Sequence, residues 1–203
     1  QNGVLGQEII PVNIPQKRKE DFIFNQDEFI RSETTIEGLG KLRPAFAKDG
    51  SVTAGNASGL NDGAAALLMA SEDGLKNHGL TPMARMVSAA VAGVEPRIMG
   101  IGPVEASQKA LSRAGLTLDQ MDIIELNEAF ASVVLTMMEE LNIPHDRMNV
   151  NGGAIAMGHP LGATGAMILG TALDELERSG RQTALVSLCV AAGMGSAMII
   201  ERV

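Results

Sequence analysis

Sixteen residues, Asn151 to Ala166, contain five glycines, one proline and no charged side chain, and His159 lies among them. Glycine permits tight turns and close approach of a ligand, and Pro160 biases His159 away from helical geometry. The sequence after Pro160 predicts a helix running through Leu173, with His159 at its N-terminus. The positive end of a helix dipole disfavours an imidazolium and favours developing negative charge. We interpret His159 as a neutral imidazole that binds an oxyanion or transfers a proton; a histidine that merely closes a loop is the alternative.

Composition excludes several classes of protein. A chain of 203 residues that is 45% hydrophobic can bury a large core, and with 2% aromatic residues this core must be aliphatic. The net charge of −8 argues against a nucleic-acid partner, and no apolar run is long enough for a membrane span. The single Cys189 fits a reducing compartment, so we predict a cytoplasmic protein. The polar start at Gln1 suggests a piece of something longer.

Strand-like and helix-like segments alternate from about residue 64 onward, which predicts an α/β fold. We expect a mixed five-stranded sheet with helices on both faces, preceded by an irregular N-terminal arm. The predicted strands are 64–69, 83–91, 122–126, 183–189 and 196–201. The predicted helices are 72–77, capped by Ser71, then 104–114, ended by Gly115, then 127–141 and 160–173. The last two strands should form a hairpin across the small-residue turn 191–195.

Two further polar groups come at the ends of predicted elements. Asn127 follows a strand, where it could position a water or an oxyanion, or simply cap the next helix. Glu128 beside it is typical of a first-turn carboxylate favoured by the helix dipole. Cys189 ends a strand before a tight turn, where backbone N–H groups can stabilise a thiolate; a buried small hydrophobe is the alternative. Loops at such ends carry functional groups, so we expect Asn127, His159 and Cys189 to form one site.

The first sixty residues contain two candidate ligand contacts. Arg31 could bind a phosphate or stack on a base, or simply pair with Asp27 or Glu28. Ser58 lies in a second glycine-rich loop, residues 50–64, where small side chains would let a long thin ligand lie against the backbone. The basic run 17–19 is typical of a solvated surface.

Four stretches of this chain, taken in order, resemble the C-terminal half of a thiolase of the acetyl-CoA acetyltransferase type. They are residues 52–59, 127–131, 151–165 and 189–195. The resemblance implies that residues 1–60 belong to a loop region that binds coenzyme A (CoA) and that residues 61–203 form a C-terminal thiolase-like domain. It implies reversible Claisen condensation and thiolysis of acetyl-CoA and 3-ketoacyl-CoA, with CoA thioesters as substrates and no cofactor or metal.

The resemblance also assigns roles to individual residues. His159 would activate the nucleophile and stabilise the enolate together with a water held by Asn127, and Cys189 would be the acid/base cysteine. The remaining assignments are Ser58 for pantetheine, Arg31 for the adenine nucleotide, Met99, Ala129 and Phe130 for the acyl pocket, and Ala191 for an oxyanion-hole N–H.

The chain departs from the family pattern in two ways. The turn after the acid/base cysteine is usually Cys-x-Gly-Gly-Gly, whereas here Ala191 and Ala192 replace two glycines. The nucleophilic cysteine of the family lies in its N-terminal half, and this chain has one cysteine. We therefore expect the chain alone to be inactive and to need its missing N-terminal half. An isolated half would expose an apolar face, so we expect a homo-oligomer, a dimer or a tetramer.

Three other interpretations stay open. A CoA-binding or assembly module without chemistry would share the same motifs. A nucleotide-binding oxidoreductase is disfavoured, because no glycine fingerprint follows the first strand of a βαβ unit with an acidic residue at the right distance. A ketoacyl synthase relative would carry a second histidine in place of Cys189.

Overall fold

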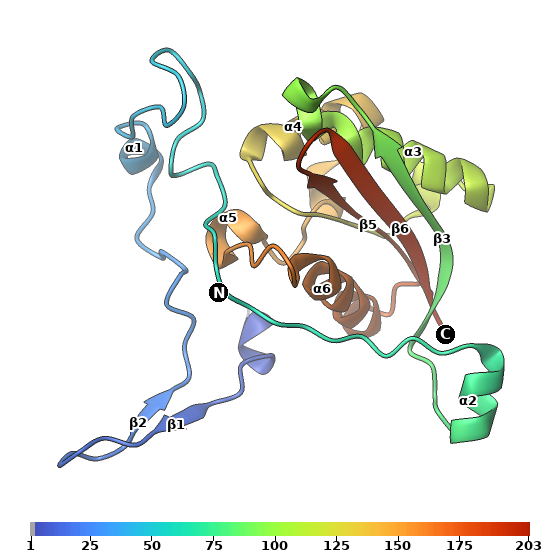
Figure 1. Ribbon diagram of the computed structural model, residues 1–203, viewed down its shortest axis with the longest axis horizontal. Coiled ribbons are helices and arrows are strands. Elements are labelled where there is room, and N and C mark those ends of the chain that lie inside the picture. The colour runs from blue at the N-terminus through green and yellow to red at the C-terminus, as the bar shows by residue number, and fades with distance from the viewer. Residues whose placement is uncertain (1–2) are drawn as a thin grey trace.

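The computed structural model describes residues 3–203, and Figure 1 shows an α/β body beside an extended arm. A four-stranded mixed sheet with the order β3-β6-β5-β4 forms the body. Strand β3 (Ala84–Gly93) pairs antiparallel with β6 (Met194–Arg202), which forms a hairpin with β5 (Thr183–Val190). Strand β4 (Ile123–Leu126) pairs parallel with β5. The predicted mixed sheet and its terminal hairpin are confirmed.

Helices cover both faces of this sheet, as the sequence predicted. Helices α3 (Gly102–Ala114) and α4 (Ala131–Leu141) lie on one face, and α6 (Thr164–Ser179) lies on the other (Figure 1). Ile124 and Leu126 of β4 point to the first face, whereas Ile123 points to α6. This alternation follows from the two-residue period of a strand and places Glu125 on the α6 face.

Local signals in the sequence set the ends of several helices. The Ser71 hydroxyl caps α2 (Glu72–His78) by accepting from the N–H of Gly74, and the left-handed Gly79 ends it at φ 61°. Gly115 ends α3 in the same way at φ 66°. The shorter elements are the 3₁₀-helices η1 (Leu5–Gln7), η2 (Pro96–Ile101), η3 (Leu118–Gln120) and η4 (His145–Arg147), the helices α1 (Ile36–Leu39) and α5 (Ala154–Met157), and the strands β1 (Val12–Ile14) and β2 (Phe22–Phe24).

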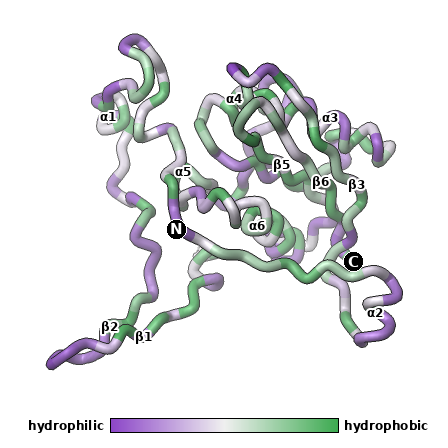
Figure 2. Tube along the Cα trace, in the orientation of Figure 1, coloured by the Kyte–Doolittle hydropathy of each residue, from purple (hydrophilic) through white to green (hydrophobic). Residues whose placement is uncertain are grey.

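The prediction of a fifth strand at residues 64–69 is wrong. These residues pair with no strand in the described part of the chain, and the side chain of Leu68 is 82% exposed. A strand needs a neighbour for its N–H and C=O groups, and this segment hydrogen-bonds to none of the four strands of the sheet. Figure 2 shows it as a largely apolar trace running across the front of the molecule toward α2.

The residues before it form an arm that stands off the body. Strands β1 and β2 pair as a short antiparallel hairpin that projects away from the sheet, and the hydrophilic tip of this hairpin carries the basic run 17–19 (Figures 1 and 2). Most side chains of the arm are exposed. Among residues 3–203, no helix is both long and apolar enough to cross a bilayer.

Candidate active site

A short segment of the arm ties two loops of the body together. The N–H of Ser58 donates to the carbonyl of Ala129 at 3.0 Å, and the Ser58 hydroxyl donates to the same oxygen at 3.3 Å. The N–H of His159 lies 3.0 Å from the carbonyl of Gly59 and 3.1 Å from Oδ1 of Asn61. The loop after β4 and the loop before α6 are therefore held next to each other.

His159 is 9% exposed, and both nitrogens of its ring have partners. Nδ1 lies 2.7 Å from Oγ1 of Thr164, and Nε2 lies 3.4 Å from Nδ2 of Asn127. The Thr164 hydroxyl donates its proton to the carbonyl of Pro160 at 2.9 Å, so it can only accept from the ring. Nδ1 therefore carries the imidazole proton, and the Nε2 lone pair faces Asn127. This tautomer can act as a base at Nε2.

The cause of the neutral imidazole differs from the one that the sequence suggested. Helix α6 begins at Thr164 instead of near Pro160, so His159 lies outside its first turn. The pKa of His159 is lowered from its usual value by burial, which disfavours the charged ring. The helix dipole, which falls off within a turn, is not needed for this effect.

Asn127 is 1% exposed, and no donor among residues 3–203 reaches its Oδ1. Its N–H donates to the carbonyl of Ser187 at 3.0 Å, which extends the pairing of β4 and β5 beyond Leu126. Helix α4 begins four residues later with Phe130 as its N-cap, so the interpretation of Asn127 as a helix cap is wrong. A buried amide oxygen without a donor is costly, and a bound water or ligand would remove that cost.

Glu128 does not lie in the first turn of α4 either. Its Oε1 accepts from Nδ2 of Asn149 at 3.1 Å, and its Oε2 accepts from the N–H of Ile155 at 3.1 Å. The carboxylate therefore connects the loop after β4 with the segment that leads to His159.

Cys189 and Asn127 both lie at the C-terminal ends of the parallel strands β4 and β5. Because β4 and β5 are parallel with Leu126 opposite Ser187, their C-terminal ends coincide, and Cys189 follows Ser187 by two residues. Burial raises the pKa of the Cys189 thiol, partly offset by its own backbone N–H. The resting group is a thiol, in contrast to the thiolate that the turn was expected to stabilise.

The residues expected to line an acyl pocket lie around the start of α4. Ala129 is buried and Phe130 is half-buried, and the ring of Phe130 meets that of Phe46 edge to face with centroids 6.2 Å apart. The 3₁₀-helix η2, which contains Met99, packs against α4. Sequence reasoning missed Phe46, because an aromatic residue in an irregular arm gives no signal of its partner.

The remaining candidates lie on the surface. Arg31 is exposed, and the ion pairs among residues 3–203 do not include it, so its predicted pairing with Asp27 or Glu28 is wrong. Ala191 is exposed in the turn between β5 and β6, and the next residue, Ala192, adopts the left-handed conformation at φ 67°.

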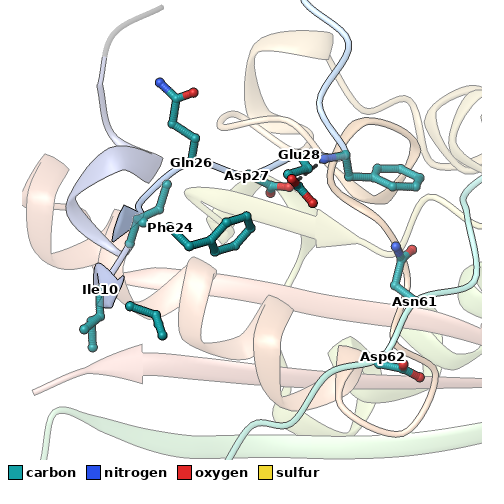
Figure 3. A pocket seen from close by; sticks show the side chains of 10 residues that line it. Ile10, Phe24, Gln26, Asp27, Glu28, Asn61 and Asp62 are labelled. Atoms are coloured by element: carbon teal, nitrogen blue, oxygen red, sulfur yellow. Dashed lines mark hydrogen bonds between the residues drawn. The ribbon is translucent and has the colours of Figure 1, made fainter. Parts of the chain in front are cut away.

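A hollow of about 640 Å³ lies beside the loop that holds His159. Figure 3 shows Asp27 and Glu28 on one side of it and Asn61 and Asp62 on another. None of the three predicted catalytic side chains lines it. Three carboxylates repel phosphate groups, so this hollow does not suit a nucleotide.

Comparisons with known proteins match both parts of the chain. The family "Thiolase, C-terminal domain" matches residues 80–202, and "Thiolase, N-terminal domain" matches residues 1–73. An acetyl-CoA acetyltransferase of Chromobacterium violaceum is 51% identical over 200 residues, covering 98% of this chain and 51% of the relative. A beta-ketoadipyl-CoA thiolase of Acinetobacter baylyi is 52% identical over 203 residues, covering 99% of this chain and 51% of the relative.

Solved structures give the same result. The Bacillus anthracis acetyl-CoA acetyltransferase superposes with a TM-score of 0.91 at 47% identity, covering 99% of this chain and 51% of that chain. A human mitochondrial 3-ketoacyl-CoA thiolase in complex with CoA superposes with a TM-score of 0.86 at 43% identity, covering 99% and 50%. This chain thus spans about half the length of the relatives that it matches.

Proposed function

This chain belongs to the thiolase family, and from that premise we propose that it is the C-terminal portion of an acyl-CoA C-acetyltransferase. The reaction is the reversible Claisen condensation of acetyl-CoA and the thiolysis of 3-ketoacyl-CoA. The observation that carries the proposal is the buried pair of a neutral His159, whose unprotonated Nε2 faces Nδ2 of Asn127, and an Asn127 whose Oδ1 lacks a donor within residues 3–203. Such a pair suits proton transfer and oxyanion stabilisation at one carbonyl group.

We assign the proton transfers in the direction of thiolysis. Nε2 of His159 accepts the proton of a nucleophilic thiol contributed by the half of the protein that this chain does not span. That thiolate attacks the 3-keto carbon, and the carbon–carbon bond breaks with its electron pair on the acetyl-CoA fragment. The Cys189 thiol delivers its proton to that carbon, which agrees with a raised thiol pKa at rest. The Cys189 thiolate then accepts the proton of CoA, whose sulfur takes the acyl group from the nucleophilic cysteine, and His159 returns its proton to the departing thiolate. A water held by Asn127 donates to the enolate oxygen.

Substrate binding follows the same assignment. We propose that Arg31 binds the adenine nucleotide of CoA, that Ser58 lies along the pantetheine, and that Met99, Ala129 and Phe130 line the acyl pocket. The exposed Arg31 has no ion pair in the described chain, so its guanidinium is available for a phosphate. Ala191 would offer its N–H to an oxyanion.

The surface of the chain supports a large partner. Its accessible surface is 13226 Å² for a mass of 21.2 kDa. A compact monomer of that mass exposes about 9,000 Å². The excess of roughly 4,000 Å² lies on this partner alone, so an interface that covered all of it would bury about 8,000 Å² in total, as large as or larger than obligate interfaces. Exposed apolar residues at Leu67, Leu68 and Met69, beside a hollow of about 450 Å³ on the α6 face of the sheet, belong to this excess.

We propose that the half of the relatives that this chain does not span covers this surface, with residues 1–60 contributing to CoA binding and 61–203 forming the catalytic domain. The whole enzyme would be a cytoplasmic dimer or tetramer. The isolated chain would self-associate, so a sharp monomer peak in light scattering would contradict this part of the proposal.

The test compares the chain alone with the chain fused to the N-terminal half of the Chromobacterium violaceum relative. We expect acetoacetyl-CoA thiolysis only from the fusion, and loss of activity on His159→Ala, Asn127→Ala or Cys189→Ala. An active fusion that is indifferent to Cys189→Ala would overturn the catalytic assignment. A folded fusion that binds CoA without turnover would favour a binding or assembly module.

A further inference from the structure

Asn149 links the end of β4 to the segment before His159. Its backbone adopts a left-handed conformation at φ 46°, which asparagine tolerates better than most residues, and its N–H donates to the carbonyl of Ile124 at 2.9 Å. Its side-chain amide bonds to both backbone groups of Leu126, because Oδ1 accepts from the N–H at 2.8 Å and Nδ2 donates to the carbonyl at 3.0 Å. A side chain thus substitutes for a neighbouring strand beside Leu126.

The same amide also reaches Glu128. Nδ2 of Asn149 donates its second proton to Oε1 of Glu128 at 3.1 Å, and Oε2 of Glu128 accepts from the N–H of Ile155 at 3.1 Å. Gly153 makes room for the carboxylate, since a Cβ there would lie 2.2 Å from Cδ of Glu128. The carboxylate therefore has both oxygens bonded to the segment that leads to His159.

Asn127 stands between two residues that Asn149 holds, Leu126 and Glu128. His159 follows Ile155, which Glu128 holds, across the end of the short helix α5. Resting on the function proposed above, we propose that Asn149 and Glu128 are positioning residues that set the separation of Asn127 and His159. Within residues 3–203, neither Asn149 nor Glu128 hydrogen-bonds to the His159 imidazole. Both residues can therefore affect the reaction only through the positions of Asn127 and His159.

The contact between Asn127 and His159 should be sensitive to small displacements of either side chain. Nε2 of His159 and Nδ2 of Asn127 lie 3.4 Å apart, at the upper end of hydrogen-bond distances. A misplacement of about 1 Å in a catalytic group costs on the order of 100-fold in rate. We therefore expect loosening of Asn149 or Glu128 to lower kcat about 10- to 100-fold and to leave KM within about twofold.

An exchange of donor and acceptor tests the proposal. Glu128→Gln places an amide N–H against the NH₂ of Asn149 or the N–H of Ile155. Asn149→Asp places a carboxylate against Glu128 and also removes the donor to the carbonyl of Leu126. The double variant restores a hydrogen bond between positions 128 and 149 with its polarity reversed, while the other oxygen at position 128 still accepts from Ile155. Glu139→Gln on the exposed side of α4 is the matched control.

Two readouts are measured for each variant. The first is the ¹⁵N NMR signal of the His159 ring in the 203-residue chain, where His78 and His145 give internal reference signals. The second is kcat and KM of the fusion described above. We expect both single variants to shift the His159 signals and lower kcat, and the control to change neither. The double variant should recover part of the loss seen in Asn149→Asp, because the bond between positions 128 and 149 returns while the bond to the Leu126 carbonyl does not.

If a single variant does not fold, Gly153→Ala provides an independent variant. Its backbone at φ −160° accepts alanine, so its only effect is to displace Glu128. Unchanged His159 signals and kcat in folded variants, or a double variant no better than Asn149→Asp alone, would overturn the positioning role while the thiolase function stands. A wild-type fusion that shows no thiolysis would overturn the proposed function. If the His159 signals still shifted in the variants at positions 128 and 149, the positioning role would remain intact.

Discussion

Nδ1 of His159 lies 2.7 Å from Oγ1 of Thr164, and this hydroxyl has already donated its proton to the carbonyl of Pro160. The arrangement leaves one tautomer for a neutral ring, the one with its proton on Nδ1. The unprotonated nitrogen is then Nε2, whose lone pair faces the amide of Asn127. The first residue of α6 thus determines which nitrogen of His159 can act as a base.

Replacing Thr164 with valine keeps the shape of the side chain and removes the hydroxyl. We expect Thr164→Val to release the tautomer of His159 and to lower the kcat of the fusion up to about 100-fold, the low end of what a general base contributes. The ¹⁵N shifts of the ring report the tautomer directly. Thr164→Ser retains the hydroxyl and serves as the control. An unchanged tautomer in the valine variant would show that the Thr164 hydroxyl does not set the tautomer of His159.

Glu125 should make the stability of the chain fall between about pH 4.5 and pH 8. Its side chain is 3% exposed, Oε1 has no donor among residues 3–203, and burial, then the charges of Glu128 and Glu175, raises its pKa from 4.5 to about 8. The folded state therefore holds a proton that the unfolded state releases between these values. The contribution of Glu125 to the free energy of unfolding should therefore be fully present below pH 4.5 and be lost as pH rises to about 8, by up to about 5 kcal/mol.

The variant Glu125→Gln keeps the neutral form at every pH and should flatten this dependence, so that it is more stable than the wild type at pH 9 or so. Urea unfolding at a series of pH values measures the difference between the two proteins. Glu139→Gln, at an exposed position of α4, should leave the profile unchanged. Parallel profiles for the wild type and Glu125→Gln would count against a buried proton.

Much of the body could be predicted from the sequence because its signals are local. The ends of α2 and α3 follow from Ser71 and Gly115, whose conformational preferences act within one turn. The failed strand at 64–69 has suitable composition, but strand formation depends on a partner that composition does not reveal. The late start of α4 has a similar cause, since Asn127 and Glu128 bond to distant groups instead of opening the helix.

The residues of the candidate site also differ in how far the sequence could reveal them. Asn127 and His159 could be singled out because each follows or precedes a predicted element, and the structure brings their side chains within 3.4 Å. Asn149 gave no such signal, because its partners lie 21 and 23 residues away in the chain. A residue that acts through distant backbone groups has no local pattern by which to be recognised.

Cys189 offers a direct measure of the raised thiol pKa. The thiolate is the reactive form, and burial disfavours it, so the rate of alkylation by iodoacetamide should reach half its maximum at a higher pH in the folded chain than in the same chain unfolded in denaturant. Because Cys189 is the one cysteine of the sequence, mass spectrometry follows a single reaction. A folded chain whose rate reaches half its maximum at the same pH as the unfolded chain, or at a lower one, would show that the turn stabilises the thiolate after all.

The turn after Cys189 stores strain at one alanine and not at its neighbour. Ala192 adopts φ 67°, where a Cβ costs about 1–2 kcal/mol, whereas Ala191 is not among the positive-φ residues of the described chain. Glycine also raises the entropy of the unfolded chain, at a cost of about 0.5–1 kcal/mol. Ala192→Gly should therefore stabilise the chain by roughly 0.5–1 kcal/mol, and Ala191→Gly should destabilise it by about the same amount. Denaturant unfolding of the two variants against the wild type measures both signs, and equal effects at the two positions would show that this turn does not hold Ala192 in the left-handed conformation.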